Sequence, residues 1–95
     1  MSLRFEWHRK KAAANLKKHG VSFEEALTVF SDPLARIFDD KDHSVEEQRE
    51  IIIGHSVDQR LLLVGFTVRG GSIRILNARK ATRREQQDYE ENVGS

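Results

Sequence analysis

The feature that most constrains the fold is a pair of adjacent glycines, Gly70 and Gly71, between two stretches of alternating apolar and polar residues. Glycine adopts positive φ angles without steric cost, and a tight two-residue hairpin turn requires such angles. A turn at these glycines predicts five cross-strand pairs: Arg69 with Ser72, Val68 with Ile73, Thr67 with Arg74, Phe66 with Ile75, and Val64 with Asn77. Side chains alternate between the faces of a strand, so one face is apolar and is predicted to lie in the core. It carries Leu62, Val64, Phe66, Val68, Ile73 and Ile75.

The opposite face of this hairpin is predicted to be outside and basic. It carries Thr67, Arg69, Ser72 and Arg74 in adjacent positions. Two guanidinium groups on paired strands repel each other unless a negative group lies between them. Two explanations stay open here: a bound phosphate, or surface ion pairs with Glu46, Glu47 or Glu85, each worth roughly 0–1 kcal/mol.

Two helices are predicted before the hairpin. Residues 8–20 are rich in alanine and lysine, with Ala13 and Leu16 expected on one stripe and Gly20 as a left-handed C-cap. In residues 22–33 the capping-box spacing S-x-x-E begins a second helix, which Asp32-Pro33 ends. Its apolar face is expected to carry Phe23, Ala26, Leu27 and Phe30.

The remaining segments are predicted to be strands and one further helix. Strands are expected at residues 3–7, 34–40, 49–56, 60–68 and 72–78. Thr82 and Glu85 repeat the capping-box spacing at the start of a short, charged helix over residues 82–93. The order of elements predicts an α+β fold: an antiparallel sheet with two N-terminal helices packed on one face and a short C-terminal helix.

The chain is expected to form one domain over residues 1–95. Its 95 residues are 38% hydrophobic and 33% charged, which allows a single modest core. A chain this short buries only about two-thirds of its unfolded surface, so a partner chain would add stability. The net charge of +1 by itself indicates no nucleic-acid partner, but basic residues collect at the start and again from Arg69 to Arg84.

Composition excludes several kinds of site. The chain has no cysteine, which rules out disulfides and thiolate zinc sites. An acidic cluster lacks the ligand alternation and turn glycine of a hard-metal loop, so no metal or other cofactor is expected. It comprises Asp39, Asp40, Asp42, His43 and Glu46. No apolar run approaches the roughly 20 residues that span a bilayer, and a cytoplasmic location without membrane contact is expected.

Three stretches, in order, carry a family resemblance: "KHGVSFEEA" at residues 18–26, "DHS" at residues 42–44, and "IRILNARKAT" at residues 73–82 followed by Arg84-Glu85. Together they resemble the BrnT-type toxins of bacterial type II toxin–antitoxin systems, over residues 5–90. The resemblance implies a RelE-like ribonuclease that inhibits translation until an antitoxin, usually a ribbon-helix-helix protein, covers it. Toxin and antitoxin together would bind operator DNA, and either a homodimer or a toxin–antitoxin heterotetramer is compatible.

The sequence departs from this family at two places. His8 and Arg9 stand where the family tends to have Asp-Pro, so a good helix N-cap and an N1 proline are lost. Asn77 stands where a serine is frequent, which alters a small polar position near the expected site. Both departures bear on activity more than on the fold.

Cleavage of RNA without a metal uses the 2′-hydroxyl as nucleophile, so the protein must move protons and stabilise charge on the phosphorus. Arg69 and Arg79 are the predicted stabilisers of the scissile phosphate, because guanidinium groups bind phosphate oxygens bidentately. The predicted RNA-binding residues are Thr67, Arg74, Lys80, Arg83, Arg84 and Lys18. For proton transfer, His19 is the predicted catalytic group, with a structural role at the helix end as the alternative. Other candidates are His43, His55 and Glu85.

Two further hypotheses come from other functional classes. A non-catalytic module would keep the toxin surface only to bind antitoxin and to act in operator binding. An autonomous DNA-binding protein is disfavoured, because the sequence has no helix-turn-helix or ribbon-arm pattern.

Overall fold

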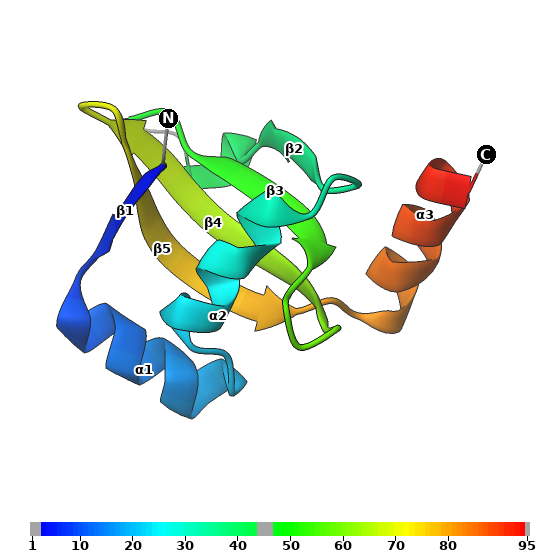
Figure 1. Cartoon of the computed structure of the whole chain (residues 1–95), viewed down its shortest axis with the longest axis horizontal. Coiled ribbons are helices and arrows are strands. Elements are labelled where there is room, and N and C mark those ends of the chain that lie inside the picture. The colour runs from blue at the N-terminus through cyan, green and yellow to red at the C-terminus, as the bar shows by residue number, and fades with distance from the viewer. Residues whose placement is uncertain (1–2, 44–46, 95) are drawn as a thin grey trace.

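The computed structural model describes residues 3–43 and 47–94, in which five strands and three α-helices form an α+β fold (Figure 1). The strands are β1 (Arg4–Trp7), β2 (Arg36–Asp39), β3 (Glu50–His55), β4 (Leu61–Arg69) and β5 (Ser72–Lys80). The α-helices are α1 (Arg9–His19), α2 (Phe23–Leu27) and α3 (Arg83–Gly94), and the 3-10 helices are η1 (Thr28–Ser31) and η2 (Lys41–His43). The strand order in the sheet is β1-β5-β4-β3-β2.

The sheet is mixed, and the prediction of an antiparallel sheet is wrong for one edge. β1 runs parallel to β5, with Arg4 opposite Ser72 and Trp7 opposite Ile75. The other neighbouring strands are antiparallel. Alternation of apolar residues is the same in both kinds of pairing, so the sequence of β1 could not indicate its direction. That direction depends on a partner strand more than sixty residues away in the chain.

One face of the sheet, here called the core face, packs against α2 and η1. Leu62, Val64 and Phe66 of β4 lie on it, as predicted, beside Ile52 and Ile75. From the helical side, the core contains Val21, Phe23, Ala26 and Val29. Phe30 joins the layers through edge-to-face contacts with the rings of Phe5 and Phe66, whose centroids lie 5.2 Å and 5.0 Å away. Val68 was expected in the core but is 60% exposed, because it lies at the hairpin end of β4.

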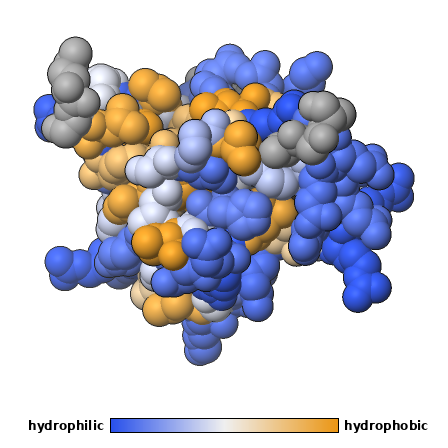
Figure 2. Space-filling model, turned by 45° about the vertical axis from the view of Figure 1, so that its right-hand side comes forward, coloured by the Kyte–Doolittle hydropathy of each residue, from blue (hydrophilic) through white to orange (hydrophobic). Residues whose placement is uncertain are grey.

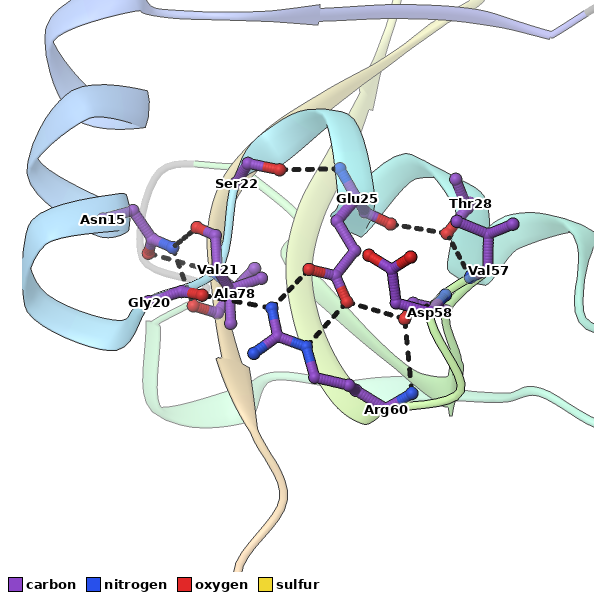
Figure 3. A network of polar contacts seen from close by, with 11 residues as sticks. Asn15, Gly20, Val21, Ser22, Glu25, Thr28, Val57, Asp58, Arg60 and Ala78 are labelled. Carbon is purple, nitrogen blue, oxygen red and sulfur yellow. Dashed lines mark hydrogen bonds and ion pairs between the residues drawn. The ribbon is translucent and has the colours of Figure 1, made fainter.

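The contact of α1 with the sheet differs from the prediction. Ala13 and Leu16 are exposed, and the buried residue of α1 is Asn15. Its side-chain amide donates to the carbonyl of Ala78 at 2.8 Å and accepts from the amide of Ala78 at 3.0 Å (Figure 3). Since β1 pairs with β5 only as far as Ile75, Asn15 supplies the hydrogen bonds that a strand neighbour would make at Ala78.

A β-bulge interrupts the β4–β5 hairpin. The predicted pairs from Arg69–Ser72 to Phe66–Ile75 are confirmed, but Gly65 is opposite Asn77 and Val64 is opposite Ala78. The predicted pairing of Val64 with Asn77 is therefore wrong by one residue. A Cβ atom at Gly65 would lie 2.8 Å from Oδ1 of Asn77, so the Asn77 side chain lies directly over this glycine.

The predicted helix caps are largely confirmed, but the α-helix predicted over residues 22–33 ends at Leu27 and is followed by the 3-10 helix η1, which ends at Ser31. Gly20 has a φ of 69° and its amide donates to the carbonyl of Leu16 at 2.8 Å, which ends α1 in a left-handed cap. At α3 the capping box is complete: the Glu85 amide donates to Thr82 Oγ1, and the Thr82 amide donates to Glu85 Oε1. At α2 it is half formed, because the Glu25 amide bonds Ser22 while its carboxylate binds Arg60.

The surface of the molecule combines hydrophilic areas with separate apolar patches, as Figure 2 shows for one side. The exposed large apolar residues are Leu3, Leu16, Leu34, Ile37, Phe38, Val57 and Val68. None of the helices in the described ranges has the length and apolar character needed to span a bilayer.

Candidate nucleic-acid interface

The face of the sheet opposite the core face is here called the arginine face. Alternation along β4 places Leu63, Thr67 and Arg69 on this face, and pairing adds Arg79 opposite Leu63 and Arg74 opposite Thr67. α3 covers part of it, because Tyr89 packs on Ile53 and Leu63. The rest carries polar side chains from β4 and β5, so the arginines lie on one side of the sheet, as predicted.

Arg69 is paired with a carboxylate at the hairpin end of the arginine face. Its Nη2 atom lies 2.7 Å from Oε2 of Glu47. Glu47 was one of the three glutamates considered in the ion-pair alternative. Both side chains keep solvent access, at 55% exposure for Arg69 and 33% for Glu47.

Thr67 holds the segment that carries Glu47. Its hydroxyl donates to the carbonyl of Gln48 at 2.7 Å, and the residue is only 2% exposed. Thr67 was expected to be an outward-facing RNA-binding residue. The structure instead engages its hydroxyl in a backbone contact, which places residue 47 above the sheet.

Glu47 lies in the field of three arginines. Its pKa is lowered, first by the hydrogen bond from Arg69 and further by the positive charges of Arg69, Arg49 and Arg74. The same ion pair holds the pKa of Arg69 above its ordinary value, and Glu6 adds a smaller effect in that direction. Glu6 is directly opposite Arg74 in the β1–β5 register. At the hairpin end Arg69 therefore holds Glu47 directly, Arg74 is the diagonal neighbour of Arg69, and Glu6 is opposite Arg74.

Arg79 lies at the other end of β5 and is bound in a different way. Its Nη1 and Nη2 atoms bond the two carboxylate oxygens of Glu85 at 2.7 Å and 2.8 Å. Glu85 also caps α3 through Thr82. The hydrogen bonds from Arg79 are the main reason that the pKa of Glu85 falls to about 2. Arg79 thus joins the sheet to the first turn of α3.

A groove of about 240 Å³ lies between α1 and the free edge of β5. Its lining brings together residues that are far apart in sequence: Lys11, Ala14, Asn15, Lys18, His19, Leu76 and Asn77. The predicted residues Lys18 and His19 lie here and not among the arginines. Asn77 belongs to both regions, since it lines the groove and its side chain lies over Gly65 on the arginine face. The other predicted contacts, Lys80, Arg83 and Arg84, are exposed where β5 leads into α3.

The remaining histidine candidates have different surroundings. The Nδ1 atom of His55 lies 3.8 Å from Oδ2 of Asp32, and its ring contacts the ring of Tyr89. Sequence reasoning missed this cluster because its members come from three separate segments. The side chain of His43 and all of Glu46 lie outside the described part of the chain.

No group of three or more carboxylates and imidazoles suited to a metal ion occurs among residues 3–43 and 47–94. Asp39, one member of the acidic cluster, accepts a hydrogen bond from Gln48 Nε2 at 3.0 Å. Gln48 is therefore joined to the sheet twice, through this bond to Asp39 in β2 and through the bond from Thr67 in β4.

Comparison with known proteins places these features in context. The family model described as "Ribonuclease toxin, BrnT, of type II toxin-antitoxin system" matches residues 7–85. The crystal structure of the Brucella abortus ribonuclease toxin BrnT is similar to this fold, with a TM-score of 0.67 and 22% sequence identity. The similarity covers 86% of this chain and 100% of the Brucella chain. No curated protein matches the sequence closely enough to add to these comparisons.

Proposed function

Because the chain belongs to the BrnT family of ribonuclease toxins from type II toxin–antitoxin systems, we propose that it cleaves RNA on the arginine face and thereby inhibits translation. The observation that carries this proposal is the gathering of Arg69, Arg74 and Arg79 on one side of a single hairpin. Guanidinium groups there can bind successive phosphates of an RNA strand.

The proposed chemistry needs no metal: the RNA 2′-hydroxyl loses its proton and its oxygen bonds the neighbouring phosphorus. The bond from phosphorus to the 5′-oxygen breaks, and the leaving 5′-oxygen takes up a proton, which leaves a 2′,3′-cyclic phosphate. Arg69 and Arg79 stabilise the negative charge that develops on the phosphate oxygens. For Arg79 this requires that Glu85 shares or releases the guanidinium, because both carboxylate oxygens now accept from it. His19 is the proposed proton-transfer group. It lines the groove together with Asn77, whose side chain also lies over Gly65 on the arginine face.

The proposed RNA path runs around the edge of β5. Arg74, Lys80, Arg83 and Arg84 bind phosphates on the side of β5 and α3, while Lys18 does so in the groove. Thr67 contributes by holding residues 47–49 in place, since its hydroxyl is already used. Such contacts position the strand and make affinity depend on salt.

The partner and cellular setting are also part of the proposal. We expect a ribbon-helix-helix antitoxin, operator DNA bound only through the toxin–antitoxin complex, and a cytoplasmic location. The RelE-like classification, the single toxin domain over residues 1–95, and assembly as a homodimer or heterotetramer belong to the same set of expectations.

A non-catalytic binding module is the second candidate, and one observation favours it: Arg69 and Arg79 are both engaged by carboxylates. The test is incubation of the purified chain with labelled RNA in EDTA. Cleavage that persists in EDTA and is lost in Arg69→Ala supports the nuclease. Intact RNA, together with harmless expression in the absence of antitoxin, supports the binding module.

A further inference from the structure

Three arginine–glutamate ion pairs are seen in the described residues, and they differ in the number of hydrogen bonds that hold them and in their exposure to solvent. Arg60 bonds both oxygens of Glu25 and also the carbonyl of Gly20 (Figure 3). The hydroxyl of Ser56 donates a further hydrogen bond to the same carboxylate. Glu25 is only 8% exposed. This network joins α2 to the β3–β4 turn, so its role is structural.

The pair between Arg79 and Glu85 also has a structural role. It is bidentate, and the same carboxylate completes the capping box of α3. Removing it would disturb a helix end as well as an ion pair.

The pair between Arg69 and Glu47 has fewer hydrogen bonds than the other two pairs and is more exposed to solvent. One guanidinium nitrogen bonds one carboxylate oxygen, and both side chains are more exposed than in the other two pairs. An exposed, single ion pair contributes little to folding, so another anion can take its place at low cost.

The position of Glu47 is nevertheless well defined. The hydroxyl of buried Thr67 bonds the carbonyl of the next residue, Gln48, at 2.7 Å. Thr67 is opposite Arg74, and Arg69 is two pairs further along the same hairpin, on the same face. Arg69 and Arg74 are therefore diagonal neighbours on one face, at which separation long side chains can meet.

The chemistry of this position matches a phosphodiester. A carboxylate and a phosphodiester each carry one negative charge and two oxygens that can accept from guanidinium groups. Besides the hydrogen bond from Arg69, the charge of Arg74 acts on Glu47, and Arg74 is the diagonal neighbour of Arg69 on the same face. An anion at this position would therefore bond Arg69 directly and lie in the field of Arg74.

We propose that Arg69 and Arg74 form a phosphate-binding site whose anion position is filled by Glu47 in the free protein, and that an RNA phosphodiester displaces this carboxylate. The proposal rests on the proposed function, because it assigns the RNA backbone as ligand. It adds Glu47 to the site and gives this residue the role of an internal competitor.

The test uses Glu47→Gln, which removes the charge and keeps the shape of the side chain. Glu24→Gln is the matched control, because Glu24 is an exposed glutamate of α2, the helix that packs on the core face. The probe is a fluorescent RNA with 2′-O-methyl groups throughout, which cannot be cut by 2′-hydroxyl attack. We expect Glu47→Gln to bind it roughly three- to tenfold more tightly than the wild type, whereas Glu24→Gln binds within about twofold.

Two further measurements make the outcome decisive. In Glu47→Gln/Arg69→Ala the gain in affinity should be lost, and inorganic phosphate should perturb the Arg69 side-chain NMR signal more strongly in Glu47→Gln than in the wild type. Unchanged or weaker RNA binding by Glu47→Gln and by Glu47→Ala, with both variants folded by circular dichroism, would overturn the proposal. Cleavage of unmodified RNA by the wild type is measured separately, so failure of the nuclease proposal is distinguishable from failure of the phosphate site.

Discussion

Asn15 and Ala78 are 63 residues apart in sequence and share two hydrogen bonds, one in each direction, between a side-chain amide and a backbone peptide group. The Asn15 amide also donates to the carbonyl of Val21 at 2.9 Å. One buried side chain thus satisfies the edge of β5 and fixes the turn between α1 and α2. It also sets the distance between Lys18 and His19 on α1 and Asn77 on β5, which line the same groove.

Replacing Asn15 by leucine should destabilise the protein strongly. The substitution leaves a buried donor and a buried acceptor of Ala78 without partners, at a cost of roughly 1–3 kcal/mol each. Urea unfolding measures the effect. Leu16→Ala is the control, because Leu16 is 51% exposed and its loss should cost less than about 1 kcal/mol. Equal unfolding free energies for Asn15→Leu and the wild type would show that these hydrogen bonds do not contribute to stability.

Gly65→Ala should destabilise the hairpin by about 1 kcal/mol, because the new Cβ would approach Oδ1 of Asn77 to 2.8 Å. The obstacle is one side chain, so Asn77→Ala should relieve it. In a double-mutant cycle the cost of Gly65→Ala should be smaller in the Asn77→Ala background. Identical costs in both backgrounds would place the strain in the backbone instead.

Glu85 should make stability depend on pH in the acidic range. Its pKa in the folded protein is lowered from 4.5 to about 2, so its contribution is complete above 4.5 and is lost as the pH falls toward 2. The unfolding free energy of the wild type should therefore fall more steeply over this range than that of Glu85→Gln. Chemical unfolding at a series of pH values measures both slopes. Parallel curves would mean that the carboxylate has the same pKa in the folded and unfolded states.

Arg69 and Arg84 should affect RNA in different ways. Arg69→Ala should lower the single-turnover cleavage rate by roughly 10²–10³, because it removes charge stabilisation at the scissile phosphate. Arg84→Ala should leave that rate nearly unchanged at saturating RNA and reduce the salt dependence of binding by about one counterion. Lys41→Ala, in η2, is the control for loss of a positive charge elsewhere. A larger loss of cleavage rate in Arg84→Ala than in Arg69→Ala would reverse the assigned roles.

Local patterns in the sequence were sufficient for most elements of the fold. The turn at Gly70-Gly71, the cap at Gly20 and the capping box at Thr82 depend on a few neighbouring residues, so spacing alone predicted them. The same is true of the apolar face of β4 and of the outward placement of Arg69 and Arg74. These features follow from backbone conformations and alternation, which act over short distances in the chain.

Only the tertiary structure decided the direction of β1, the bulge at Asn77, the burial of Asn15 and the choice of partners for the arginines. Most of these depend on contacts between segments that are distant in sequence, where several pairings satisfy the same local pattern. The sequence by itself determined that the hairpin would present guanidinium groups on one face. Glu85 is only six residues from Arg79, so that pair depends on how β5 leads into α3. Packing of more distant segments decided that Glu47 would lie against Arg69, because charge attracts any nearby carboxylate and only the fold determines which one is near.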